Sequence, residues 1–163
     1  VNSRHPGLIS KFGGHAMAAG LTLKSGGFAT FAKAYDDAVR EQLKPEQLTG
    51  ELWSDGELTP TELTLEIAQL LRNAGPWGQA FEEPLFDGYF TIVQQRLVGE
   101  RHLKLVLETQ CGTVMLDAIA FNVDLHTWPD ATINHARIVY KLDVNEYRGN
   151  FSLQLMVEQI EAM

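Results

Sequence analysis

The sequence predicts an α+β fold in which helices and strands are segregated along the chain, with the strands forming a five-stranded antiparallel sheet or barrel. Apolar residues recur at helical spacing over 28–43 and again over 60–73. From residue 85 onward the alternation changes to a period of two, which is typical of strands with one buried face. Five segments show this alternation or fit between the turns: 85–98, 103–107, 113–121, 137–144 and 151–158.

Before the first helix, a pair of adjacent glycines is expected to form a turn between two short strands, 8–12 and 18–23. Gly13 and Gly14 can adopt backbone angles closed to other residues, and their N–H groups can form a nest for an anion. His15 would then stand at the rim as a hydrogen-bond donor to a phosphate oxygen. The alternative is a tight turn whose histidine caps a helix or packs against a strand.

The two helices have different sequence signals. Over 28–43 the apolar side chains form one stripe, and Pro45 is the expected stop. The first domain is therefore expected to span 1–47 and the second 48–163, with a boundary near Thr49-Gly50. Thr59-Pro60-Thr61-Glu62 is a capping box with proline at the first helical position, which predicts a helix over 60–73 that leads the second domain.

Charge is spread unevenly along a chain whose net charge is −8. The segment 51–87 carries eight acidic residues and one basic residue, Arg72. The other bases of the second domain fall in two windows, so that one side of the domain can attract a polyanion while another repels it. These windows are Arg96, Arg101 and Lys104, and Arg137, Lys141 and Arg148.

Three residues in or near these windows are the best candidates for nucleic-acid contact. Lys104 and Lys141 point away from the apolar rows of their strands and can reach a ligand. Tyr147, beside Arg148, can stack on a base, which with cations along the backbone is what single strands require. The alternatives are solvated strand faces for the cations and a half-buried ring stapling the hairpin for Tyr147.

Other features of the sequence bear on the cellular compartment and on metal binding. A single cysteine, Cys111, cannot form an intramolecular disulfide, and no apolar run is long enough for a membrane span, so we expect a cytoplasmic protein without membrane contact. Asp124, His126, Asp130 and His135 lie close in sequence, but their spacing favours a polar loop over a metal site.

Several motifs resemble one family. The segment 3–23, with Gly13-Gly14-His15 at its centre, resembles the DHH-associated domain of the DHH phosphoesterase superfamily. Four later blocks resemble, in order, the C-terminal part of the RecJ family of exonucleases, which degrade single-stranded DNA from the 5′ end. These blocks are 73–79, 84–88, 98–104 and 140–150.

The resemblance implies the end of a DHH-associated α/β domain over 1–47 and an oligonucleotide/oligosaccharide-binding (OB) fold over 48–163. It implies a nucleic-acid-binding part of a 5′-to-3′ exonuclease of DNA recombination and repair. The family's catalytic metals, Mg or Mn, are held by an N-terminal domain, so we expect no catalytic residue or metal here and no activity of the chain alone. The implied phosphate-binding residues are Gly13, Gly14 and His15, and the implied nucleic-acid-binding residues are Arg96, Arg101, Lys104, Lys141, Tyr147 and Arg148.

Two alternatives remain open. The chain could belong to another DHH-type phosphodiesterase acting on short oligonucleotides or cyclic dinucleotides, which explains the glycines but not the five strands. It could instead be a non-enzymatic module that binds a protein, such as the single-strand-binding protein, which explains the acidity better. The expected partner under the main interpretation is single-stranded DNA.

Overall fold

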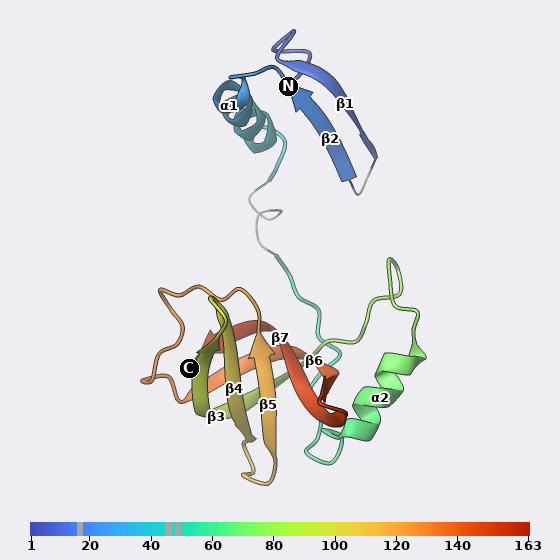
Figure 1. Ribbon diagram of the computed structural model, residues 1–163, viewed down its shortest axis with the longest axis vertical. Coiled ribbons are helices and arrows are strands. Elements are labelled where there is room, and N and C mark those ends of the chain that lie inside the picture. Colours follow the sequence, from blue (N-terminus) through green and yellow to red (C-terminus); the bar gives the residue numbers. More distant parts are fainter. Residues whose placement is uncertain (16–17, 45–46, 48–49) are drawn as a thin grey trace. The chain divides into compact units, whose positions relative to one another are not determined.

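The chain divides into two compact units, Val1–Leu52 and Trp53–Met163 (Figure 1). The computed structural model describes residues 1–15, 18–44, 47 and 50–163. Pro45 and Thr49, the expected helix stop and boundary residue, lie outside the described residues. No helix in the described ranges is long and apolar enough to cross a membrane.

The first unit contains a two-stranded antiparallel sheet and one helix. Strand β1 (Ile9–His15) pairs with β2 (Ala18–Leu23), and helix α1 (Phe28–Arg40) follows. The helix predicted over 28–43 is confirmed, although it ends three residues earlier. The predicted glycine turn is wrong, because Gly13 and Gly14 lie within β1 and pair with Gly20 and Ala19.

Helix α2 (Leu65–Ala74) opens the second unit and begins five residues later than the capping box predicted. The Glu62 carboxylate does accept hydrogen bonds from the N–H and hydroxyl of Thr59, at 2.8 and 2.7 Å. That pattern closes an isolated turn, and the chain is extended again at Thr64. The Thr64 hydroxyl accepts from the N–H of Ile67, so Thr64 is the N-cap.

Five strands close into a barrel whose neighbours run in the order β3-β4-β5-β7-β6, with β6 returning to β3 (Figure 1). Their bounds are β3 (Phe86–Val98), β4 (His102–Thr109), β5 (Met115–Ala120), β6 (His135–Tyr147) and β7 (Asn150–Ala162).

The expectation of a wholly antiparallel barrel is wrong at one pair, since β5 and β7 are parallel. The reason is topological. Directions that alternate around a closed ring need an even number of strands, so a closed barrel of five must contain at least one parallel pair. The chain meets this condition by crossing from β5 to β6 on the far side of β3, which leaves β7 to close the ring.

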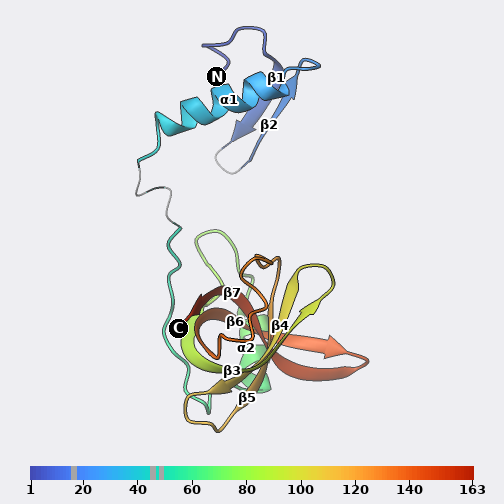
Figure 2. The same ribbon diagram turned by 90° about the vertical axis from the view of Figure 1, so that its left-hand side faces the viewer.

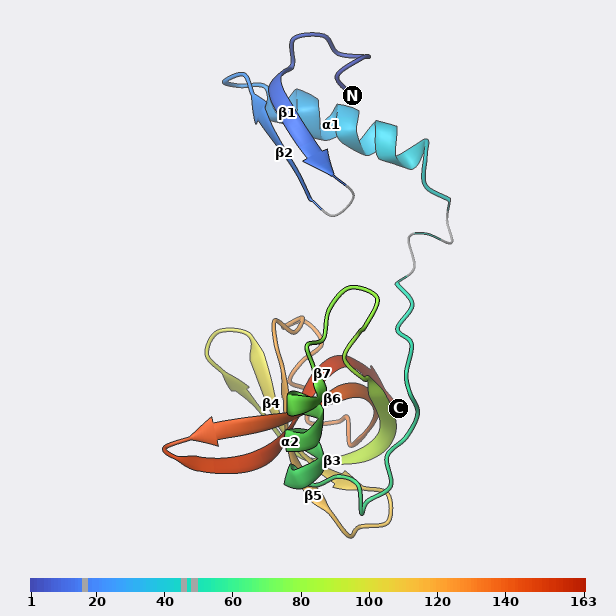
Figure 3. The ribbon, with the colours of Figure 1, turned by 90° about the vertical axis from the view of Figure 1, so that its right-hand side faces the viewer.

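The barrel interior is filled by the inward-facing side chains of the strands. On β4 these are Leu103, Leu105 and Leu107, all fully buried. Tyr140 of β6 is also fully buried between Phe86 and Phe90, and burial raises the pKa of its hydroxyl. Helix α2 packs against β6 and β7 (Figure 3), and its Ala68 joins the core.

The hairpin of β6 and β7 is longer than the sequence indicated. A turn was predicted over 145–150, but β6 continues to Tyr147 and β7 starts at Asn150. Only Arg148 and Gly149 remain between them, both in the left-handed region with φ of 51° and 78°, as in a type I′ turn. The paired ends of these strands extend beyond the barrel wall (Figure 2).

Candidate nucleic-acid interface

The outer face of the barrel carries a hollow of about 760 Å³ between the β3-β4-β5 wall and the β6–β7 hairpin. Strand alternation decides which side chains reach it. Leu103 and Leu105 face inward, so Lys104 between them faces outward. The register places Arg96 of β3 directly opposite Lys104, and therefore two cations lie side by side in the wall of the hollow.

Lys104 already has an anionic neighbour. Its ammonium nitrogen lies 3.4 Å from a carboxylate oxygen of Asp117, which also lines the hollow. A partly exposed pair of this kind contributes little to stability. Lys104 can therefore exchange Asp117 for a phosphate at small cost, whereas the described structure gives Arg96 no ion pair to exchange.

Tyr147 contributes an aromatic surface to the same hollow. The residue is 63% exposed, so more of it is open to solvent than the alternative of a half-buried ring that staples the hairpin requires. The guanidinium carbon of Arg148 lies 5.2 Å from the Tyr147 ring centroid, within cation–π range. The end of the hairpin thus brings one cation onto the ring of Tyr147, although Arg148 itself does not line the hollow.

Two further predicted cations, Arg101 and Lys141, do not line the hollow either. Arg101 is exposed in the turn between β3 and β4, beside the wall but not lining the hollow. Lys141 lies on β6, where its ammonium is 3.1 Å from Glu83 and 3.6 Å from Glu158. Burial lowers the pKa of Lys141, but the two carboxylates outweigh burial and raise it above its ordinary value. The structure therefore does not join Lys141 to the stripe that its sequence position suggested.

Polar residues at the floor of the hollow carried no distinct signal in the sequence. They come from the hairpin, namely Asn145, Asn150, Ser152 and Gln154. Alternation over 138–144 and 151–157 could have assigned them to an outer face. Their place in one hollow with residues of β3 and β4 depends on the strand order, which alternation does not contain.

The predicted phosphate site of the first unit does not have the backbone geometry of an anion-binding nest. Gly13 and Gly14 are extended strand residues, and neither has a positive φ. A Cβ at Gly14 would lie 2.6 Å from the Cβ of Ala19, so glycine is required there by close strand approach. A Cβ at Gly13 would meet nothing within 4 Å, which leaves its backbone open to a ligand. His15 is exposed at the end of β1.

The described residues contain no group of three or more His, Cys, Asp and Glu side chains that could hold a metal ion. Asp124 and Asp130 instead order the loop between β5 and β6. Their carboxylates accept from the backbone N–H groups of His126 and Thr132, at 3.0 and 2.8 Å.

A closed five-stranded barrel with this strand order defines an OB-type domain, and its outer face carries cations and an exposed aromatic ring. A sequence model of the "RecJ OB domain" family matches residues 54–159, and the chain belongs to this family.

The relatives extend the likeness to nearly the whole chain. It is 54% identical over 160 residues to the single-stranded-DNA-specific exonuclease RecJ of Escherichia coli, and 50% identical over 163 residues to that of Haemophilus influenzae. These alignments cover 98% and 99% of this chain but only 28% of each relative. The chain thus spans under a third of the length of the curated relatives it matches.

Among solved structures, RecJ of Thermus thermophilus, in complex with Mg²⁺, shares the fold. The TM-score is 0.63 at 23% identity, and the match covers 96% of this chain and 23% of that one. It confirms the architecture of the chain's elements.

Proposed function

We propose that this chain is the nucleic-acid-binding, C-terminal part of a 5′-to-3′ single-stranded-DNA exonuclease that acts in DNA recombination and repair. The observation that supports this most is the hollow in which Arg96, Lys104 and Tyr147 meet. Cations there bind the phosphates of one strand, and the Tyr147 ring stacks on a base. Arg101 and Arg148 extend the attraction on either side.

The first unit has a separate role in this proposal, as the end of a DHH-associated domain. The open backbone at Gly13, the tight approach at Gly14 and the exposed His15 bind a substrate phosphate next to the catalytic centre. The metal ions, Mg or Mn, are held by another region of the longer enzyme, where they supply the attacking hydroxide. That enzyme works in the cytoplasm, where its DNA substrate is found.

Binding by the barrel is tested with two charge-matched double variants of the chain. Arg96→Gln with Lys104→Gln removes two cations from the hollow. Arg72→Gln with Lys141→Gln removes two cations that lie outside it. Anisotropy of labelled oligo(dT), measured across a salt series, gives the affinity and its salt dependence for each.

We expect the hollow variant to bind more weakly and its log–log salt slope to shrink by about 1.4, since each lost phosphate contact removes about 0.7 for single strands. The control should bind like the unmodified chain. Equal binding by all three proteins would exclude the hollow as the DNA site. The chain alone should not hydrolyse DNA with Mg²⁺ or Mn²⁺.

A second candidate function has one observation in its favour. The segment 51–87 carries eight acids against one base, which suits a basic protein surface better than DNA. A protein-binding module, for instance for the single-strand-binding protein, would lose its partner but not its DNA affinity when Glu66 and Glu82 are replaced by Gln. Loss of a protein partner together with unchanged DNA binding in the hollow variant would favour this function.

A further inference from the structure

We propose that Phe121, held by His102, is a nucleobase-stacking platform at the end of β5, beyond the hollow. This inference rests on the proposed binding of single-stranded DNA. Neither side chain was expected from the sequence to contact nucleic acid. Phe121 starts the connection between β5 and β6 and is therefore separate from the Tyr147 hairpin.

The two rings form a defined pair. Their centroids lie 5.0 Å apart and their planes cross at 69°, which is an edge-to-face contact. Such a contact can cover at most one face of Phe121. The Phe121 side chain remains 51% exposed, so the ring has a free surface of the kind on which a base can stack.

His102 is itself fixed by the backbone. Its Nδ1 accepts a hydrogen bond from the N–H of Asn122 at 3.2 Å, which orients the imidazole and requires that nitrogen to be unprotonated. The next N–H, of Val123, donates to the carbonyl of Arg101 at 3.0 Å. Two hydrogen bonds thus tie the segment after β5 to the β3–β4 turn. Because its neighbours are held in this way, the Phe121 ring should lose little conformational entropy when a ligand binds.

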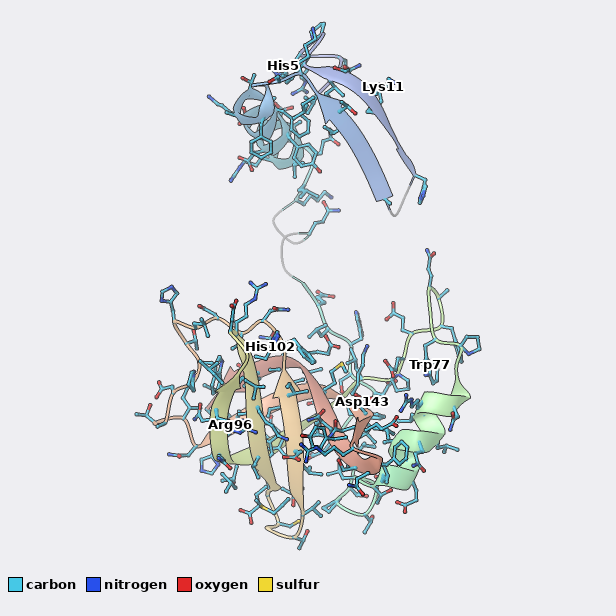
Figure 4. All side chains as sticks on the ribbon, in the orientation of Figure 1. His5, Lys11, Trp77, Arg96, His102 and Asp143 are labelled. Atoms are coloured by element: carbon cyan, nitrogen blue, oxygen red, sulfur yellow. The ribbon has the colours of Figure 1, made fainter. Side chains whose placement is uncertain are left out.

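The pair continues the outer face that carries the hollow. On β4, alternation places His102 on the same side as Lys104. Phe121 directly follows β5, two residues after the outward-facing Ile119. Val98 pairs with His102 across the β3–β4 ladder. Val98, Lys104 and Ile119 all line the hollow. Figure 4 shows His102 and Arg96 on the strands of this same wall.

The charges around the pair favour a nucleobase as the occupant. Arg101 lies next to His102 in sequence, and Lys104 is two residues further along the same face. These cations attract a polyanion, whose phosphates they bind while an adjacent base reaches the ring. A strand bound at Arg96 and Lys104 therefore passes Phe121, and the footprint of the barrel exceeds the hollow by at least one base.

The test compares two ligands on the 163-residue chain: oligo(dT) and an abasic oligonucleotide of equal length and charge. Phe121→Ala should weaken oligo(dT) binding about 5- to 150-fold, the range found for one stacked base. Binding of the abasic strand should not change, and neither should the salt slope for oligo(dT), because no phosphate contact is lost. Phe121→Trp should retain affinity, and its added fluorescence should be quenched by oligo(dT).

Phe81→Ala is the matched control. Phe81 is 57% exposed and also packs on an aromatic neighbour, Trp77, with ring centroids 4.9 Å apart. It lies in an acidic loop, and Trp77 stands beside α2, apart from His102 and Arg96 (Figure 4). Its removal should not affect DNA affinity. Phe121→Leu, which keeps apolar bulk without a π face, replaces Phe121→Ala if the latter does not fold.

The outcomes separate the two proposals. If the unmodified chain binds neither ligand, the proposed function itself is wrong. If the unmodified chain binds oligo(dT) and the Phe121 variant binds this ligand equally well, the proposed binding in the hollow is retained and the proposed platform is wrong. Equal weakening toward the abasic strand, or an equal effect of Phe81→Ala, also overturns the platform. If the Phe121 variant instead loses only a protein partner, the ring is a protein contact.

Discussion

Lys104 and Lys141 occupy equivalent positions in the sequence pattern but have different surroundings in the barrel. Both face outward, and the register even places them in one row across the strands, through Ile119 and Met156. Lys141 is held by carboxylates from a loop and from β7, whereas Lys104 has one acidic neighbour inside an open hollow. The side-chain direction could be predicted from alternation. The ion pairs could not, because Glu83 comes from a loop that alternation does not place.

Asp87 provides a prediction about pH. Its carboxylate accepts from the Ser54 hydroxyl and from the Arg137 guanidinium, and these contacts lower its pKa below the ordinary value of 3.8. A lowered pKa stabilises the folded state above about pH 4, and this stabilisation is lost as the pH falls through the folded-state value.

Asp87→Asn should therefore reduce the free energy of unfolding at pH 7, by about 1.5–3 kcal/mol for hydrogen bonds to a charged group. The difference from the unmodified chain should shrink steadily below pH 4. Urea denaturation at a series of pH values measures both. A difference that stays constant down to pH 2 would show that the carboxylate charge has no part in it. Asp36→Asn, at an exposed helical pair, is the control and should have an effect below about 0.5 kcal/mol.

At the scale of elements, the presence of the strands could be predicted better than the residues at which elements begin and end and the strands with which they pair. The period of two marked three of the barrel strands, because each has one buried face, and the other two were placed as the segments that fit between the turns. The start of α2 was missed because a capping-box pattern also closes a single turn, and only the extended Thr64 shows that the helix starts later. The glycines were assigned to a turn for their conformational freedom, while the structure places both in a strand and requires the lack of a side chain at Gly14.

The β6–β7 hairpin depends on its two-residue turn, and this yields a prediction. Gly149 has a φ of 78°, where a Cβ is disfavoured by about 1–2 kcal/mol. Gly149→Ala should lower the free energy of unfolding by about that amount and weaken oligo(dT) binding, because Tyr147 is displaced from the hollow. Gly50→Ala is the control, since Gly50 has no positive φ and a Cβ there would meet nothing within 4 Å. Equal stability of the two variants, by urea denaturation, would contradict the role of the turn.

At the scale of the whole molecule, the two units differ in how much they bury. The barrel unit has a continuous core of fully buried side chains from its strands and α2. In the described part of the first unit, Ala34 is the only buried hydrophobic residue, and Phe12, Phe28 and Tyr35 are more than half exposed. Burial of apolar area is the main term that offsets chain entropy, so the units should differ in stability.

Amide hydrogen exchange of the 163-residue chain measures this difference directly. The amides of β3 to β7 should exchange at rates set by cooperative unfolding of the barrel, whereas those of β1 and β2 should exchange through low-energy local opening. Oligo(dT) should slow exchange in the barrel further, because binding to the folded state adds to its stability. In a longer protein that covers Phe12 and Phe28, the amides of β1 should become protected as well. Equal protection of both units in the isolated chain would mean that the two-stranded sheet and α1 are stable without such cover, and that the first unit is a domain in its own right.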